Sequence, residues 1–158
     1  MMKIKNMNII ALDIDDCILP TNVNYFGMTD DADMMLEINL KRLAMILEKY
    51  DMKVFITSAW YAILKFVDGE LSMKYPKEHS ERNEYKQFDL IKKYIGDNIV
   101  GLSCGNREKD IKELSVDNKV VIIDDMDLKH LENENCLFCE VKGFINGNVG
   151  YKIRNFFK

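Results

Sequence analysis

An apolar segment that ends in clustered acids is the strongest constraint on how this chain can fold. Residues 8–19, NIIALDIDDCIL, run from the strand-like Ile9–Leu12 directly into Asp13, Asp15 and Asp16. Buried strands do not normally end in grouped carboxylates, because a charge taken from water is costly unless it is paired or bound to a metal. Asp13 and Asp15 are two residues apart, so in an extended chain their side chains point the same way. We expect a ligand site here, since open α/β sheets bind ligands at the carboxyl ends of their strands. The alternative is a strand that stops in an acidic turn.

The composition indicates one globular domain of moderately acidic character. The 158 residues are 47% hydrophobic, which is enough for a full-sized core, and we predict a single domain over residues 1–158. A net charge of −4 argues against a stable complex with a nucleic-acid duplex, which usually requires a basic face, but it leaves open a nucleic-acid end as substrate. No apolar run approaches membrane-spanning length, and Asp13 interrupts the N-terminal apolar run before it reaches the length of a signal peptide. We therefore expect a cytoplasmic protein with no membrane partner.

Cys136 and Cys139 form a CxxC pair inside the strand-like segment NCLFCEV. Residues three apart on a strand face opposite sides, so these thiols are not expected to share an ion. A redox CxxC begins a helix, and no second CxxC completes a zinc site. We interpret both residues as buried structural thiols, and reduced cysteines also fit the cytoplasm.

Strand-like and helix-like patterns alternate along the chain. The predicted strands are Ile9–Leu12, Lys53–Thr57, Asn98–Ser103, Lys119–Asp124 and Cys136–Val141. The predicted helices are Met34–Tyr50, which the acidic cluster at 29–33 begins, Tyr61–Val67, Asn83–Ile95, Arg107–Leu114, Asp127–Leu131 and Asn148–Lys158. The very polar residues 68–82 are predicted to be a loop or small lid, with a disordered linker as the alternative. This order predicts an α/β fold, a doubly wound, Rossmann-like parallel sheet of about five strands with helices on both faces.

Polar side chains fall at the ends of the predicted strands and at the start of one helix. They are Asp13 and Asp15, Thr57 and Ser58, Lys109, and Asp124 and Asp125. Each has an ordinary structural explanation, since an acid after a strand often caps the next helix and a lysine on a helix is usually solvated. Together they suit a phosphoryl group, which needs a cation, neutral donors and a positive side chain. If the sheet reverses direction between its first and fourth strands, Asp13 and Asp124 lie side by side and could share one Mg²⁺.

These motifs, in this order, resemble those of the haloacid dehalogenase superfamily of phosphohydrolases. The family's DxDx motif matches Asp13–Asp16, and its apolar strand ending in Thr or Ser matches Val54–Thr57. Its lysine at the start of a helix matches Lys109, with Lys112 as the second candidate, and its strand ending in paired acids matches Val120–Asp125. The first and last of these motifs are specific in combination, and the four together span residues 9–127.

The resemblance implies a Mg²⁺-dependent phosphatase that acts through an aspartyl-phosphate. Asp13 would be the nucleophile, and Asp15 would be the general acid that protonates the leaving oxygen and later activates water. The expected Mg²⁺ ligands are Asp13, the backbone carbonyl of Asp15, Asp124 and, directly or through water, Asp125. The expected phosphoryl-binding residues are Thr57, Ser58 and Lys109. Members commonly have Gly after the second aspartate, where this chain has Asp16.

The insertions between the motifs bear on the substrate. Residues 18–34 and 68–82 are too few for a full cap domain, so the resemblance implies an open site. Such a site suits a bulky substrate, for example a nucleotide, the phosphorylated end of a nucleic acid or a phosphoprotein. The stretch Thr57–Trp60 resembles the domains of this superfamily associated with RNA repair, although those usually have Arg where this chain has Tyr61; the alternative for Trp60 is a plain core residue.

Two other functions are consistent with part of the pattern. A catalytically inactive relative used for binding is the first, and Asp16 in place of Gly is its best support. A phosphorylation-responsive receiver domain is the second. In a receiver the lysine follows the last acids, whereas Lys109 precedes Asp124, so the order favours the hydrolase.

Overall fold

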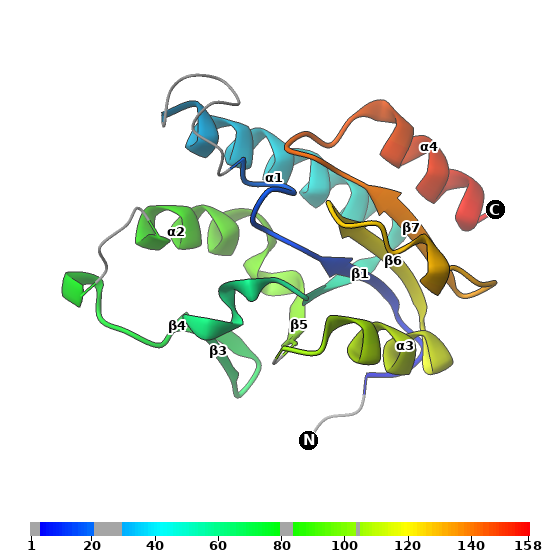
Figure 1. Cartoon of the computed structure of the whole chain (residues 1–158), viewed down its shortest axis with the longest axis horizontal. Coiled ribbons are helices and arrows are strands. Elements are labelled where there is room, and N and C mark those ends of the chain that lie inside the picture. Colours follow the sequence, from blue (N-terminus) through cyan, green and yellow to red (C-terminus); the bar gives the residue numbers. More distant parts are fainter. Residues whose placement is uncertain (1–3, 21–29, 80–83, 104) are drawn as a thin grey trace.

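A parallel five-stranded sheet forms the centre of the protein. The computed structural model describes residues 4–20, 30–79, 84–103 and 105–158. The strands of this sheet are β1 (Asn8–Leu12), β2 (Met52–Ile56), β5 (Ile99–Leu102), β6 (Lys119–Asp124) and β7 (Cys136–Glu140). Their order is β5-β2-β1-β6-β7, with all neighbours parallel (Figure 1). The chain therefore builds outward from β1 in both directions, and the predicted α/β fold with five parallel strands is confirmed.

Helices cover both faces of the sheet. The helices are α1 (Asp30–Tyr50), α2 (Glu84–Ile95), α3 (Arg107–Asp117) and α4 (Gly147–Phe156). Alternate β1 residues divide between two cores, because side chains alternate along a strand. Ile10 and Leu12 belong to the core with α1, α2 and α4, whereas Ile9 and Ala11 belong to the core with α3. All four side chains are at most 1% exposed, as expected for a central strand covered on both faces.

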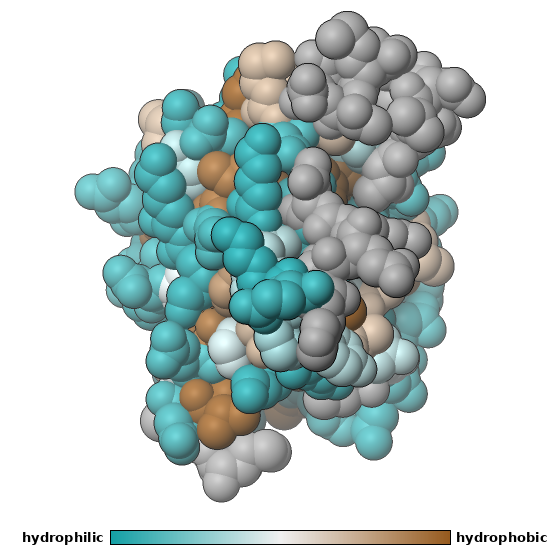
Figure 2. All heavy atoms as spheres, turned by 90° about the vertical axis from the view of Figure 1, so that its left-hand side faces the viewer, coloured by the Kyte–Doolittle hydropathy of each residue, from teal (hydrophilic) through white to brown (hydrophobic). Residues whose placement is uncertain are grey.

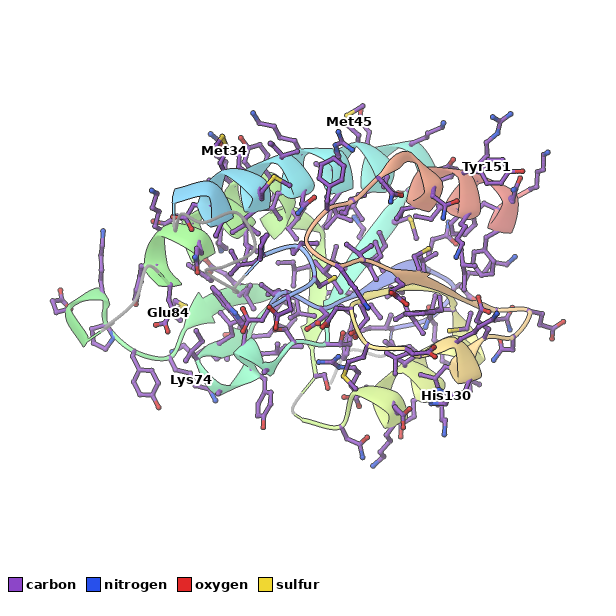
Figure 3. All side chains as sticks on the ribbon, turned by 45° about the horizontal axis from the view of Figure 1, so that its top comes forward. Met34, Met45, Lys74, Glu84, His130 and Tyr151 are labelled. Carbon is purple, nitrogen blue, oxygen red and sulfur yellow. The ribbon has the colours of Figure 1, made fainter. Side chains whose placement is uncertain are left out.

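The outer sides of the helices face solvent. Met34 and Met45 project from α1 and Tyr151 from α4, away from the sheet (Figure 3). No helix in the described ranges combines the length and apolar character that crossing a membrane requires.

The structure corrects the prediction for residues 61–79. Instead of a helix over Tyr61–Val67 followed by a loop, a short 3₁₀ helix, η1 (Ala59–Ala62), leads into an antiparallel hairpin of β3 (Leu64–Val67) and β4 (Glu70–Met73). Asp68 and Gly69 form its two-residue turn with φ of +53° and +77°. Asp-Gly is a strong signal for such a turn, since both positions need positive φ.

The other predicted elements are present, with small differences at their ends. The short helix predicted at Asp127–Leu131 is a 3₁₀ turn, η4 (Lys129–Leu131), and two further 3₁₀ turns are η2 (Lys77–His79) and η3 (Gly96–Asn98). Residues 21–29 of the predicted irregular segment and residues 80–83, at the end of the predicted loop and the start of the next predicted helix, lie outside the described residues.

The two cysteines of the CxxC pair face opposite sides of β7, as predicted. Cys136 is buried in the α3-side core and Cys139 in the core on the other face. Burial raises the pKa of both thiols to about 11. Neither residue therefore has the environment of a reactive or metal-binding thiol.

A buried asparagine on α1 joins two loops at the carboxyl end of the sheet. The side-chain amide of Asn39 donates to the carbonyls of Ile18 and Gly143 at 2.8 and 3.0 Å, and its oxygen accepts from the backbone N–H of Ile145 at 2.9 Å. The N–H of Gly143 also donates to the carbonyl of Cys17. This network holds the turn after β1 against the segment that precedes α4.

We expect Asn39→Ala to lower the free energy of unfolding by about 2–4 kcal/mol, because three buried backbone groups would lose their partner. Urea denaturation followed by circular dichroism measures this change. Asn155→Ala on the exposed side of α4 is the control and should change stability by less than about 0.5 kcal/mol. Equal stability of Asn39→Ala and the wild type would contradict the assigned role.

Candidate functional site

Three neighbouring strands bring polar side chains to the same level at the carboxyl end of the sheet. Leu12 ends β1 and pairs with Ile123 of β6. The N–H of Asp13 then donates to the carbonyl of Ile123 at 3.0 Å, and the N–H of Thr57 donates to the carbonyl of Leu12 at 2.8 Å. Thr57 and Asp13 thus follow β2 and β1, and Asp124 ends β6, so the three residues lie in register on adjacent strands. Strand alternation directs their side chains to the face that α3 covers.

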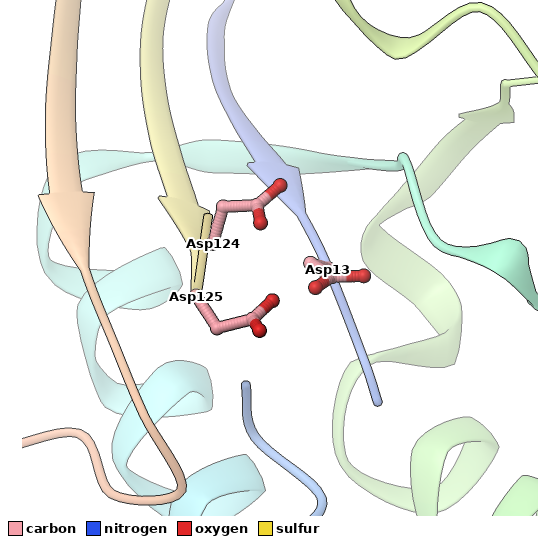
Figure 4. Close-up of side chains that lie close together, drawn as sticks. All are labelled: Asp13, Asp124 and Asp125. Carbon is pink, nitrogen blue, oxygen red and sulfur yellow. The ribbon is translucent and has the colours of Figure 1, made fainter. Parts of the chain in front are cut away.

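The acids of the first and fourth predicted motifs meet at this point. Asp13, Asp124 and Asp125 each offer a carboxylate oxygen, and these oxygens all lie within 4.8 Å of one another (Figure 4). Asp13 is 4% exposed and Asp124 is fully buried, while Asp125 is half-buried. Three oxygen ligands so arranged could hold a divalent cation such as Mg²⁺ or Ca²⁺, which prefer carboxylate oxygens.

The positive side chain at these acids comes from Arg107, which the sequence reasoning did not single out. Arg107 is the first residue of α3, and its guanidinium lies 2.6 Å from Asp124 Oδ2 and 3.4 Å from Asp13 Oδ1. Lys109, the predicted cation, is two positions further along the helix and therefore on roughly its opposite side. Lys109 and Lys112 are both exposed. The signal in the sequence was the helical phase of REKDIKEL, which separates the direction of Arg107 from that of Lys109.

The electrostatics of the cluster show a shortage of positive charge. Burial, with the nearby Asp125 and Asp124 carboxylates, raises the pKa of Asp13 to about 8, and Arg107 only partly opposes this shift. Burial also raises the pKa of Asp124, although the N–H of Met126 and Arg107 act in the other direction. One guanidinium among the described residues thus faces three carboxylates, and a further cation would stabilise their ionised forms.

The other predicted site residues differ in their hydrogen bonds. The Asp15 carboxylate accepts a hydrogen bond from Trp60 Nε1 at 2.8 Å. The Ser58 hydroxyl caps η1 by accepting from the N–H of Trp60 at 3.2 Å. The Thr57 hydroxyl is buried and has no hydrogen-bond partner among the described residues. Buried hydroxyls normally find a partner, so the Thr57 hydroxyl is suited to a ligand beside Asp13.

Asp16, which replaces the glycine expected from the resemblance, adopts a glycine-like backbone conformation. Its φ is +60°, and its N–H donates to the carbonyl of Leu19 at 2.8 Å within a tight turn. Aspartate tolerates this left-handed region better than most side chains. The substitution therefore preserves the path of the chain after the two acids of the first motif.

Comparisons with family models, with curated proteins and with solved structures found no match to this chain. The fold and the site together define an α/β protein with a buried carboxylate cluster at the point where a parallel sheet reverses its winding direction. Ligand sites in open α/β sheets lie at this point.

With EDTA present, we expect the Asp13 carboxyl group to contribute a loss of stability as the pH rises from about 4 to about 8. The folded pKa of Asp13, about 8, lies above its ordinary value of 3.8, so across this interval the folded protein holds a proton that the unfolded chain releases. Asp13→Asn should flatten this dependence, as measured by urea denaturation at several pH values. Asp97→Asn, at an exposed aspartate before β5, should keep the wild-type slope. Equal slopes for Asp13→Asn and the wild type would contradict the assignment.

A pair of substitutions tests the backbone role of residue 16. We expect Asp16→Gly to stay within about 0.5 kcal/mol of the wild type, because glycine adopts positive φ freely. Asp16→Ala should lower the free energy of unfolding by about 1 kcal/mol, because an L side chain is strained there. Thermal or urea denaturation distinguishes the two. A similar loss in both variants would assign the effect to contacts of the Asp16 side chain instead.

Proposed function

We propose that this protein is a Mg²⁺-dependent phosphomonoester hydrolase of the haloacid dehalogenase type. The observation that carries the proposal is the cluster of Asp13, Asp124 and Asp125, which pairs with a single guanidinium among the described residues. Thr57 follows the neighbouring strand, and its buried hydroxyl has no hydrogen-bond partner in the described part of the chain. A phosphoryl site requires negative ligands for a metal, a neutral donor and a positive side chain in one place, and these residues with Arg107 supply that set.

The donor set fits Mg²⁺. The three carboxylates supply only oxygen ligands, within 4.8 Å of one another, and we assign Asp13, Asp124 and Asp125 as its side-chain ligands, with the backbone carbonyl of Asp15 as a fourth. When bound, the ion would offset the repulsion between an anionic carboxylate and an anionic phosphate ester.

In the proposed reaction, a carboxylate oxygen of Asp13 attacks phosphorus, and the bond from phosphorus to the leaving oxygen breaks. Asp15 gives its proton to that leaving oxygen, which departs as an alcohol. Asp15 then takes a proton from a water molecule as the water oxygen attacks the aspartyl-phosphate, releasing inorganic phosphate and restoring Asp13. Each residue ends the cycle in the state in which it began.

The phosphoryl oxygens would be held by neighbouring side chains. Thr57 would donate its buried hydroxyl, and Ser58 is the adjacent donor candidate. Arg107 is the cation best placed to neutralise phosphoryl charge, because its guanidinium already reaches Asp13 and Asp124. Lys109 and Lys112, which the resemblance favoured, would have to act from exposed positions on α3.

For the substrate, we propose a phosphomonoester on a bulky group, such as a nucleotide or the phosphorylated end of a nucleic acid. The face that carries α2 and the β3–β4 hairpin is mostly hydrophilic, with isolated hydrophobic residues (Figure 2). Exposed lysines and acids are mixed there, for example Lys65, Asp68, Glu70 and Lys74. This balance favours no single polymer, so nucleotides, end-phosphorylated oligonucleotides and phosphopeptides should be compared directly.

One observation favours a second candidate, a catalytically inactive relative that binds phosphorylated ligands. Arg107 pairs with both Asp13 and Asp124, and this contact neutralises part of the cluster with a side chain of the protein itself. In an inactive module, such a pair would replace the metal.

We expect the wild type to hydrolyse 4-nitrophenyl phosphate with Mg²⁺ and to lose this activity with EDTA. Asp13→Asn should lower kcat by roughly 1,000-fold or more, because the nucleophile is removed, while circular dichroism shows a retained fold. Asp97→Asn is the matched control and should keep the wild-type kcat.

Metal binding is checked separately from turnover. Mg²⁺ should raise the melting temperature of the wild type but not that of Asp124→Asn, because binding to the folded state stabilises it. A metal-induced shift without turnover of any compound in the phosphorylated library would favour the binding module. No shift and no turnover would reject both the metal site and the hydrolase.

A further inference from the structure

The contact between Trp60 and Asp15 joins two segments that are far apart in the sequence. The indole Nε1–H donates to Asp15 Oδ1 at 2.8 Å across 45 positions of the chain. Trp60 is 5% exposed and belongs to the same buried cluster as Ile14 and Leu64. The ring therefore has little freedom to move, and its single N–H group points at the carboxylate.

Trp60 is also anchored to the strands that carry the rest of the site. Its backbone N–H donates to the hydroxyl of Ser58, which caps η1, and η1 follows Thr57 almost immediately. The N–H of Thr57 in turn donates to the carbonyl of Leu12, one residue before Asp13. Through these hydrogen bonds, the Trp60 ring on η1 connects the Asp15 carboxylate to the end of β1, where Asp13 lies.

An indole N–H only donates, so it must meet an oxygen that accepts. In a protonated carboxyl group the carbonyl oxygen is the better acceptor, and the other oxygen carries the proton. Because Oδ1 accepts from Trp60, a proton on the Asp15 carboxyl group would be carried by Oδ2. Fixing which oxygen carries the proton, and where it points, is what a general acid needs in order to reach a leaving oxygen.

We propose that Trp60 is the positioning residue of Asp15, holding Oδ1 so that Oδ2 delivers the proton to the leaving group. The proposal rests on the proposed function, in which Asp15 is the general acid. It differs from a core role for Trp60, which would require the ring but not the indole N–H.

The contact itself can be tested without any activity. Trp60 is the only tryptophan, so a ¹⁵N-labelled protein has one indole cross-peak and its assignment is unambiguous. In Asp15→Ala the indole proton should move upfield and exchange faster with solvent, because its acceptor is gone. Asp16→Asn, at the neighbouring acid, should leave the peak in place. An indole resonance that is unchanged in Asp15→Ala overturns the proposal, and this measurement decides the contact even where a Trp60 variant does not fold.

Kinetics separate positioning from packing. Trp60→Phe keeps an aromatic ring and removes the N–H, and its fold is checked by urea denaturation. Protonation matters most for a basic leaving oxygen, and kcat/KM reports on the first transfer step alone. We therefore expect kcat/KM to fall by about tenfold for phenyl phosphate and to stay within about threefold of the wild type for 2,4-dinitrophenyl phosphate. Tyr61→Phe, on the same short helix at a 39% exposed position, should match the wild type on both substrates.

The outcomes distinguish this proposal from the function on which it rests. If the wild type hydrolyses both esters and Trp60→Phe loses the same factor in kcat/KM on each, the proposed function stands and the positioning role is rejected. If the wild type hydrolyses neither ester nor any other phosphorylated substrate, the proposed function fails, and the catalytic role of Trp60 fails with it. The indole resonance then shows whether the Trp60–Asp15 contact is structural.

Discussion

The site depends on three carboxylates that are held together against their mutual repulsion. Asp13, Asp124 and Asp125 lie within 4.8 Å of one another in a region where water is largely excluded. Removing a single carboxylate from water costs several kcal/mol unless other charges or hydrogen bonds compensate. The chain supplies part of this compensation through Arg107 and the N–H of Met126. This compensation is incomplete, and the pKa of Asp13 is therefore raised to about 8, which favours its protonated form.

The surrounding elements can be understood as supports for this cluster. The pairing of β1 with β6 sets Asp13 beside Asp124, and the first turn of α3 brings Arg107 to both. On the other side of β1, Thr57 follows β2, and η1 carries Trp60 to Asp15. These side chains come from strand ends and helix starts, whose positions are fixed by two buried cores. Sites built on rigid elements hold their geometry better than sites built on loops.

The sequence predicts the elements that apolar runs between polar segments define, and it is less decisive where the apolar spacing fits two kinds of structure. The five strands of the sheet were predicted because each is a short apolar run between polar segments. The hairpin of β3 and β4 is not predicted, because the apolar spacing over Tyr61–Val67 also fits a helix, and only the Asp68-Gly69 pair signals the turn. The resemblance points to Lys109 as the phosphoryl-binding cation, whereas the helical phase of α3 brings Arg107 to Asp13 and Asp124.

The sequence by itself determined the strand ends that carry the acids, the alternation of strands and helices, and the residue types available for chemistry. Only the tertiary structure decided which of these residues meet. Arg107 and Asp13 are 94 positions apart, and Trp60 and Asp15 are 45 apart. Local propensity sets the backbone of each segment over a few residues. The distance between side chains on different segments follows instead from strand register and helix packing, which depend on the whole core at once.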